Sequence, residues 1–490
     1  MVEDNNHKTH PTELDTFLPH DGSNQKDGLA AKYQVQVASR DVESAAAQRD
    51  GKGFDPFLER KVPNPTTDCD TLTHLLKASL GTGILAMPDA FKSAGLVVGI
   101  FATVLVAFVC THCAYILVKC AHVLYYKTRR TQMSFAEVSE AAFATGPKWA
   151  RGFAVPSKYL ILISLFVTYF GTCSVYAVIT AKNFNKVINY YLDDVYHSDY
   201  QVDIRFMILA LLIPMILLSW VPDLKYLAPV SMIANFLMSA GLGITFYYLI
   251  MGLQDGISFE KTPASGAIAA FPNFFSITIF AMEAIGVVMP LENSMKTPQH
   301  FTGICGVLSK GMSGVTFVYI ILGFLGYACY GDAVEGSITL NLPTAEIAAQ
   351  VVQISIGLAV YCTFGLQFYV CLEIGWDSIK GYFTKSPLLA NYVMRTVLVT
   401  GAVLLAIACP TISPFIGLIG AFCFSILGLL IPAFIETVTY WDVGFGAYNW
   451  VMVKNVIICV IAMLALVFGS ESAVRDIIKE FITTPDGSKV

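Results

Sequence analysis

The sequence predicts an all-α polytopic membrane protein. Of its 490 residues, 55% are hydrophobic and only 14% are charged, whereas soluble domains carry about 25% charged residues. Apolar runs of about 20 residues, the length with which a helix spans a bilayer, occur eleven times along the chain. The net charge of −5, without any basic tract, argues against nucleic acid as a partner.

The eleven apolar runs define the predicted domain organisation. They lie near residues 71–93, 95–125, 157–182, 204–220, 225–251, 273–295, 305–330, 346–372, 391–409, 413–437 and 449–469. Residues 1–68 are polar, rich in Asp, Gly and Pro, and lack the pattern of a signal peptide, so we expect a largely disordered tail. Residues 69–470 then form the membrane domain, and residues 471–490 form a second tail.

The distribution of Lys and Arg predicts which side of the membrane each loop faces, because cytoplasmic loops carry an excess of both. On one side, the loops contain Lys127, Arg129, Arg130, Lys148, Arg151, Lys296, Lys380 and Lys385. The opposite loops, near residues 183–203, 254–271 and 331–345, contain only Lys186 and Lys261. The N-terminus is therefore expected to be cytoplasmic. An odd number of spans places residues 471–490 outside the cell or in a lumen.

The first apolar run contains a predicted break. It reads "SLGTGILAMP" from Ser79 to Pro88, and both glycine and proline disfavour a continuous helix. In hydrocarbon, each unpaired backbone N–H or C=O costs several kcal/mol. Such a break therefore persists only where other groups use the freed hydrogen-bonding capacity.

The sixth run repeats this pattern. It reads "FSITIFAMEAIGVVMPLEN" from Phe275 to Asn293, with Gly286 and Pro290 in the places of Gly83 and Pro88. The two runs are five helices apart, so the second unit enters the membrane from the opposite side. The predicted inverted halves span residues 71–251 and 273–437, with an extra helix at 449–469. Paired broken helices of this kind indicate a transporter's binding site.

The expected ligand of these breaks is a zwitterion. The half-helix after the first break directs free N–H groups and a positive dipole end into the membrane centre, where a carboxylate fits. Carbonyls freed in the sixth run can accept hydrogen bonds from an ammonium group. The predicted substrate-binding residues are therefore Gly81, Thr82, Gly83, Phe280, Ala281 and Met282.

Two ionisable residues are candidates for proton coupling. Glu283 lies in the presumed break of the sixth run, and an acid inside the membrane is a functional candidate by default. The alternative for Glu283 is a neutral acid that only bonds loose backbone. His74 lies two turns before the first break, and histidine exchanges protons near neutral pH. The alternative for His74 is an interfacial histidine at a helix start.

The chain offers no sign of an enzyme, a cofactor or a resident metal. We find neither a Walker motif, nor an HExxH motif, nor a Ser-His-Asp order in context. Cys110 and Cys113 have the spacing of half a zinc site, but two further ligands are missing nearby, so packing inside a helix is the preferred interpretation. Energy for transport must then come from a gradient.

Four segments of the sequence stand out: "THLLKASLGTGILAMPDAF" (Thr73–Phe91), "HCAYILVKCAH" (His112–His122), "FAMEAIGVVMPLENSMK" (Phe280–Lys296) and "LQFYV" (Leu366–Val370). They resemble the proton-coupled amino acid transporter family of the amino acid/auxin permease group, in an insect-like version. The resemblance runs from about residue 60 to 470. It implies eleven helices in a LeuT-type 5+5 inverted repeat with discontinuous helices 1 and 6. It also implies symport of a proton with small neutral amino acids such as glycine, alanine and proline.

The resemblance assigns roles to individual residues. The family's proton-coupling histidine falls on His74, its Gly-Thr-Gly break on Gly81–Gly83, and its sixth-helix acid on Glu283. Family members work at the plasma membrane or in late endosomes and lysosomes, and some couple amino acids to growth signalling. The outer-loop disulfide described for mammalian members has no counterpart: the loop near 183–203 lacks cysteine, and Thr344 replaces the other one.

We therefore expect a secondary active symporter of small neutral amino acids and a proton, with the proton as coupling ion and no cofactor. Two alternatives stay open at this point. One is an amino-acid sensor with little flux, whose cytoplasmic tail recruits growth-signalling partners. The other is a sodium-coupled amino acid carrier of the same fold.

Overall fold

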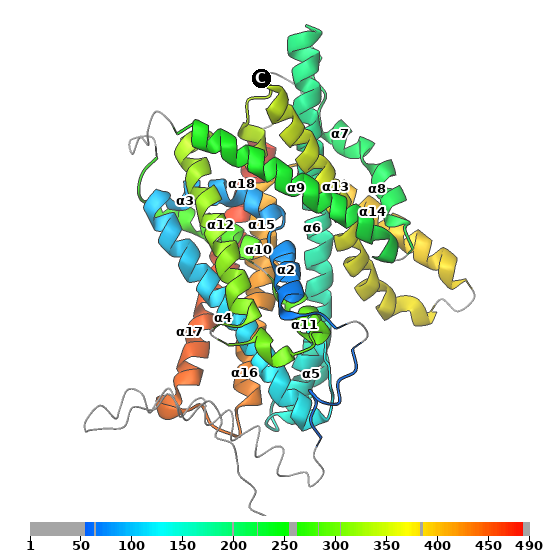
Figure 1. Ribbon diagram of the computed structural model, residues 1–490, viewed down its shortest axis with the longest axis vertical. Coiled ribbons are helices and arrows are strands. Elements are labelled where there is room, and N and C mark those ends of the chain that lie inside the picture. The colour runs from blue at the N-terminus through cyan, green and yellow to red at the C-terminus, as the bar shows by residue number, and fades with distance from the viewer. Residues whose placement is uncertain are drawn as a thin grey trace, which may run out of the picture.

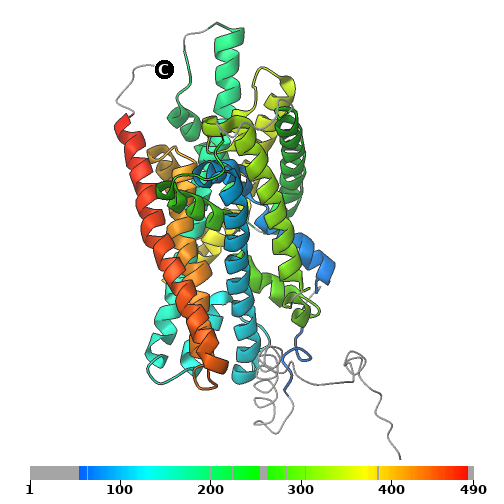
Figure 2. The same ribbon diagram turned by 90° about the vertical axis from the view of Figure 1, so that its left-hand side faces the viewer.

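The computed structural model describes residues 54–62, 65–197, 200–222, 224–253, 262–282, 284–303, 305–382 and 386–483. Within these ranges the chain forms an elongated bundle of helices, shown from two sides in Figures 1 and 2. Most of the predicted N-terminal tail, the candidate Glu283 and the last seven residues lie outside the described residues.

Helices cover each predicted apolar run. Among the described residues, nine helical segments are long and apolar enough to cross a membrane. They are Leu96–Thr128, Arg151–Asp193, Pro229–Met251, Ile268–Ser294, Val307–Ala333, Ile347–Tyr382, Pro387–Ala408, Ser413–Thr439 and Trp450–Lys479. The fourth predicted run is a shorter apolar helix, Ile204–Ser219. The first run is divided into pieces.

The continuous helices of the bundle are long. They are α4 (Leu96–Thr128), α6 (Ala154–Tyr190), α9 (Leu224–Met251), α12 (Val307–Tyr330), α13 (Ile347–Ile379) and α14 (Pro387–Ala408). Shorter elements are α5 (Phe135–Thr145), α7 (Ile204–Ala210) and α8 (Leu212–Ser219). The tenth run consists of α15 (Ser413–Ile419), a π-helical stretch (Gly420–Leu430) and α16 (Ile431–Thr439).

The first run is interrupted where the glycines predict it. Helix α2 (Asp68–Ser79) ends, Gly81 is extended with φ −85° and ψ −158°, and a 3₁₀ helix (Thr82–Ala86) leads into α3 (Met87–Ala94). A capping box begins α2: the Asp70 N–H donates to Thr67 Oγ1 at 3.2 Å, and the Thr67 N–H donates to Asp70 Oδ2 at 3.1 Å. This pairing satisfies donors that a helix start leaves open.

The sixth run also consists of two helices. Helix α10 (Phe271–Met282) precedes the undescribed residue 283, and α11 (Ile285–Ser294) follows it. Between them Ala284 has φ −117° and ψ 0°, outside helical geometry. Both glycine-interrupted runs are therefore divided near their middle.

The last helix is longer than the hydropathy predicts. Helix α17 (Trp450–Leu464) continues through a π-helical turn (Ala465–Gly469) into α18 (Ser470–Thr483), and Figure 2 shows them as one rod along the bundle. The predicted apolar run ends at residue 469 because α18 contains many charged residues. Those charges support the helix through pairs such as Lys479 with Asp476 at 3.7 Å.

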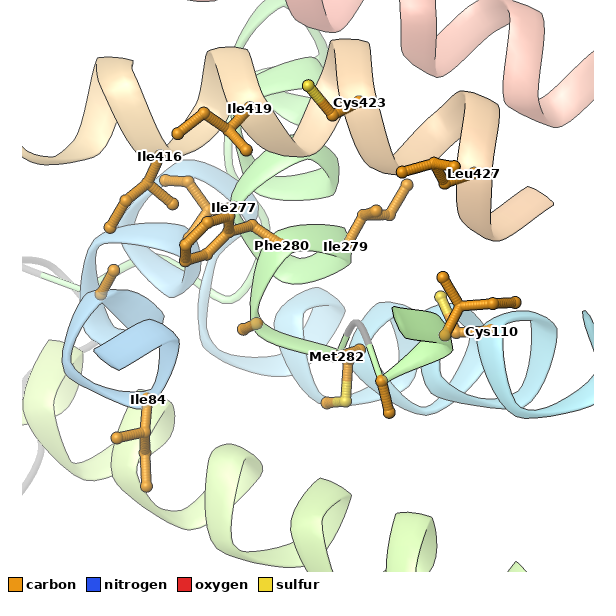
Figure 3. Close-up of a cluster of buried hydrophobic side chains, with 14 of the residues drawn as sticks. Ile84, Cys110, Ile277, Ile279, Phe280, Met282, Ile416, Ile419, Cys423 and Leu427 are labelled. Carbon is orange, nitrogen blue, oxygen red and sulfur yellow. The ribbon is translucent and has the colours of Figure 1, made fainter. Parts of the chain in front are cut away.

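The hydrophobic core surrounds α10. Figure 3 shows Ile277 and Phe280 on the side of Ile416 and Ile419, and Ile279 toward Leu427. All six side chains are buried. The core thus packs α10 against the tenth run and fixes the end of α10 that precedes the second break.

Candidate substrate site at the broken helices

The two breaks touch each other. A Cβ added to Gly83 would lie 2.7 Å from the Ala281 Cα and 3.0 Å from its Cβ. Real Cβ atoms do not approach backbone so closely, so only glycine fits at position 83. Segments 81–83 and 280–282, far apart in sequence, therefore lie side by side in the interior.

A tyrosine of α12 joins the two breaks. The Tyr319 side chain is fully buried, and its hydroxyl contacts the carbonyl oxygen of Ser79 and, at 3.1 Å, that of Ala281. Ser79 ends α2, and Ala281 is the last but one residue of α10, so both carbonyls are among those that a helix end leaves open. A hydroxyl carries one proton and donates to one carbonyl at a time. The other carbonyl is available to a further donor.

The first break is also tied to α6 and α13. The Tyr176 hydroxyl shares a hydrogen bond with the Thr82 side chain, and Gln367 Nε2 donates to the Tyr176 oxygen at 3.4 Å. Thr82 and Tyr176 are each 3% exposed. Because α6 and α13 pack along each other, these bonds connect the broken helix to a continuous pair of helices.

The structure brings the six predicted substrate-binding residues together. Gly81 is half-buried and precedes the 3₁₀ helix, which contains the buried Thr82 and Gly83. Phe280, Ala281 and Met282 end α10 and are 9%, 4% and 0% exposed. The first N–H groups of a helix and the last C=O groups of another have no partner within their own helix. Helix ends with such open donors and acceptors therefore lie close together where Gly83 meets Ala281.

The surroundings of the second break are apolar and nearly closed. The rings of Phe280 and Phe424 are 5.8 Å apart, and the Thr316 hydroxyl lies 3.9 Å from the Met282 sulfur. A cavity of about 10 Å³ lies beside Met282 and Ala284. A void of this size holds a single water molecule, so an amino acid enters only when side chains move.

His74 lies away from the breaks. It is on the exposed face of α2 with Thr73 and Lys77, about two turns before Gly81. Glu283 is not among the described residues.

Sequence reasoning did not single out Tyr319 or Tyr176. Both lie in apolar helices where a tyrosine is common, and a sequence gives no indication of which tyrosine faces a break. Burial is the property that identifies them, because a fully buried tyrosine hydroxyl usually has a hydrogen-bond partner.

A bundle of apolar helices in which two broken helices meet is the architecture of a secondary transporter. The profile of the transmembrane amino acid transporter protein family matches residues 65–475. The chain belongs to this family, whose members here are transporters and not enzymes. The resemblance carried by the four sequence segments is thereby confirmed.

Two curated relatives have printed names that fit this family. The chain is 58% identical over 480 residues to the "Proton-coupled amino acid transporter-like protein pathetic" of Drosophila melanogaster, covering 98% of each chain. It is 26% identical over 397 residues to the "Amino acid transporter ANT1" of Arabidopsis thaliana, covering 77% of this chain and 87% of the relative.

Solved structures show weaker likeness. A complex of MhsT with L-phenylalanine has a TM-score of 0.49 and 11% identity, covering 82% of this chain and 98% of that one. The inward-facing conformation of Mhp1 has a TM-score of 0.46 and 14% identity, covering 88% and 94%.

Proposed function

We propose that the protein is a secondary active symporter that moves small neutral amino acids, such as alanine, glycine and proline, together with a proton. The observation that carries this proposal is the contact between the two broken helices at Gly83 and Ala281. The printed name of the Drosophila relative supports the proton as coupling ion. The proposed architecture is an eleven-span, LeuT-type 5+5 inverted repeat with a cytoplasmic N-terminus.

In this proposal the substrate completes the hydrogen bonding of the breaks. The amides of Gly81, Thr82 and Gly83 bind the carboxylate, since a helix N-terminus favours an anion. The ammonium group donates to whichever carbonyl Tyr319 leaves free, Ser79 or Ala281. The apolar wall at Phe280 and Met282 then limits the side chain to a small one.

The proton is proposed to bind at His74 and Glu283. His74 is exposed on a polar face of α2, as a group that exchanges protons with water must be. A zwitterion with one proton carries one net charge, worth about 2.3 kcal/mol per 100 mV. A one-unit pH difference adds roughly 1.4 kcal/mol. Together these terms sustain a gradient of roughly several hundred-fold, enough for uptake at the plasma membrane or efflux from a lysosome.

The test is current in voltage-clamped oocytes given alanine at pH 5.5 and 7.5 without sodium, for wild type and His74→Ala. We expect an inward current that is larger at the acid pH and lost in the variant, with equal surface protein by biotinylation. A current that requires sodium would identify a sodium-coupled carrier. Surface protein that passes no current and takes up no labelled alanine would contradict symport.

A further inference from the structure

A fully buried carboxylate lies at the far end of α11 from the break. The Glu292 side chain is 0% exposed, and three side chains supply its hydrogen bonds. Arg60 NH1 and NH2 are each 3.2 Å from Glu292 Oε1, and His122 Nε2 is 3.0 Å from the same oxygen. The Tyr125 hydroxyl donates to Oε2 at 3.0 Å. An ionised carboxylate is stable at such a depth only with partners of this kind.

Arg60 belongs to a segment that precedes the first span, which we name the strap and define as residues 54–62. Its guanidinium also donates to the Thr131 carbonyl at 2.7 Å and lies 5.3 Å from the centre of the Tyr125 ring. Phe57 places its ring edge-on against His122, with centroids 5.0 Å apart. The strap therefore packs over the ends of α4 and α11, where it covers the carboxylate.

The same region joins the two broken helices. Thr66, just before α2, forms a parallel β-bridge with Met295, just after α11. The Thr66 N–H donates to the Ser294 carbonyl at 2.9 Å, and the Lys296 N–H donates to the Thr66 carbonyl at 3.0 Å. A movement of α2 or α11 relative to α4 must therefore disturb the strap or the Glu292 contacts.

Charge balance in this cluster limits how the strap can leave. With Arg60 in place and His122 neutral, the Arg60–Glu292–His122 cluster has zero net charge. Withdrawal of Arg60 alone removes the positive charge bonded to Glu292 and leaves the cluster with a net charge of −1, which is unfavourable to the extent that α4 still shields the carboxylate from water. One proton, bound by His122 or by Glu292 itself, restores the net charge to zero. Both proton acceptors are already in contact.

We propose that Glu292 and His122 form a second proton site, which is loaded when Arg60 withdraws and emptied when Arg60 returns. The site rests on the geometry alone, whereas its use in coupling rests on the proposed symport. Arg60 and the proton compete for the same carboxylate. A proton that accompanies the substrate is bound as the strap opens on the side that we propose is cytoplasmic, and the returning guanidinium displaces it into water.

Other charged groups near the cluster do not replace Arg60. A cavity of about 560 Å³, lined by Arg60, Lys61 and Lys296 among others, gives water and protons access to the strap. Asp68 of α2 is paired with His300 at 2.8 Å, in an exposed position. Helices α2 and α4 and the turn at 298–301 pack against α11, and from these elements only His122 and Tyr125 of α4 bond the Glu292 carboxylate among the described residues.

The test measures release of the strap directly in the full-length protein. Leu58 is 84% exposed, so Leu58→Cys accepts a nitroxide spin label after the exposed cysteines Cys69 and Cys305 are changed to serine. In lipid nanodiscs between pH 5 and 8, we expect the ratio of mobile to immobile label to rise tenfold per pH unit of acidification within the transition, as one bound proton requires. Glu292→Gln should remove this pH dependence.

Two further variants keep the test decisive. If Glu292→Gln does not fold, His122→Gln should shift the transition to lower pH, because only the carboxylate then accepts the proton. His300→Gln, which alters an exposed histidine pair, should leave the transition in place. Label mobility that is independent of pH in the wild type, or a transition that survives in Glu292→Gln, would overturn the proposal. Strap release without any amino acid transport would instead contradict the proposed function and leave the proton site standing.

Discussion

Replacing Tyr319 by phenylalanine tests which hydrogen-bond donors the two carbonyls at the broken helices need. The change removes one hydroxyl and keeps the ring that α12 buries. In the wild type, Tyr319 donates to one of the Ser79 and Ala281 carbonyls, and in the proposed site the substrate's ammonium donates to the other. In the variant the ammonium must donate hydrogen bonds to both carbonyls. Otherwise one buried carbonyl has no hydrogen-bond partner, which costs about 1–3 kcal/mol of binding free energy.

The cost should depend on the substrate. The ammonium of alanine has three N–H bonds, whereas the secondary ammonium of proline has two. Proline therefore has fewer donors left for a second carbonyl after its other contacts are made. We expect the KM for proline to rise roughly 5- to 150-fold, the range that corresponds to about 1–3 kcal/mol, and the KM for alanine to rise less.

The assay is uptake of labelled alanine and proline over a concentration series, with surface protein measured in parallel. Tyr327→Phe is the matched control, since Tyr327 is equally buried at 1% exposure and lies about 12 Å further along the same helix. An equal loss for both substrates would show that the hydroxyl only holds the backbone in shape. An unchanged KM for both substrates would refute the idea that Tyr319 and the ammonium group share the two carbonyls.

Two further substitutions test other contacts. Gly83→Ala should abolish transport, because the new methyl group would lie 2.7 Å from the Ala281 Cα and such overpacking costs about 1–3 kcal/mol. Gly243→Ala, where a Cβ meets nothing within 4 Å, should leave uptake at the wild-type rate. Lys454→Met should lower the thermal stability of the purified protein, because it leaves Glu436, now paired at 2.6 Å and 6% exposed, without its cation at a cost of about 3–5 kcal/mol. A melting temperature equal to that of the wild type would show that this pair is not needed for stability.

The local features of the fold could be predicted from the sequence. Apolar runs report burial in lipid or protein one helix at a time, so each predicted run is helical. The break at Gly81 follows from glycine and proline within a few residues of each other, which is also local information. The end of the last helix was misplaced because hydropathy falls in α18 while helical hydrogen bonding continues.

The contacts between helices could not be predicted in this way. Tyr319 reaches two breaks that precede it by 240 and 38 residues, and periodicity within α12 does not report such distances. Glu292 is a different case, because an acid at the end of an apolar run is visible in the sequence. Its position alone does not indicate a buried site, since a helix end normally meets water. The strap, which precedes the first span, packs with α4 over this helix end and places Glu292 in the interior.

The break and the Glu292 cluster lie at opposite ends of one helix, which suggests how substrate and proton influence each other. Helix α11 has ten residues and is therefore about 15 Å long. If substrate at the break favours the position of α11 in which the strap is open, binding linkage requires the reverse effect with equal free energy. Saturating alanine should then move the midpoint of the strap transition to higher pH. The alanine Kd, measured with the same protein, should fall on acidification by the factor that this shift implies. Unequal factors would show that the two sites communicate through something other than α11 and the strap.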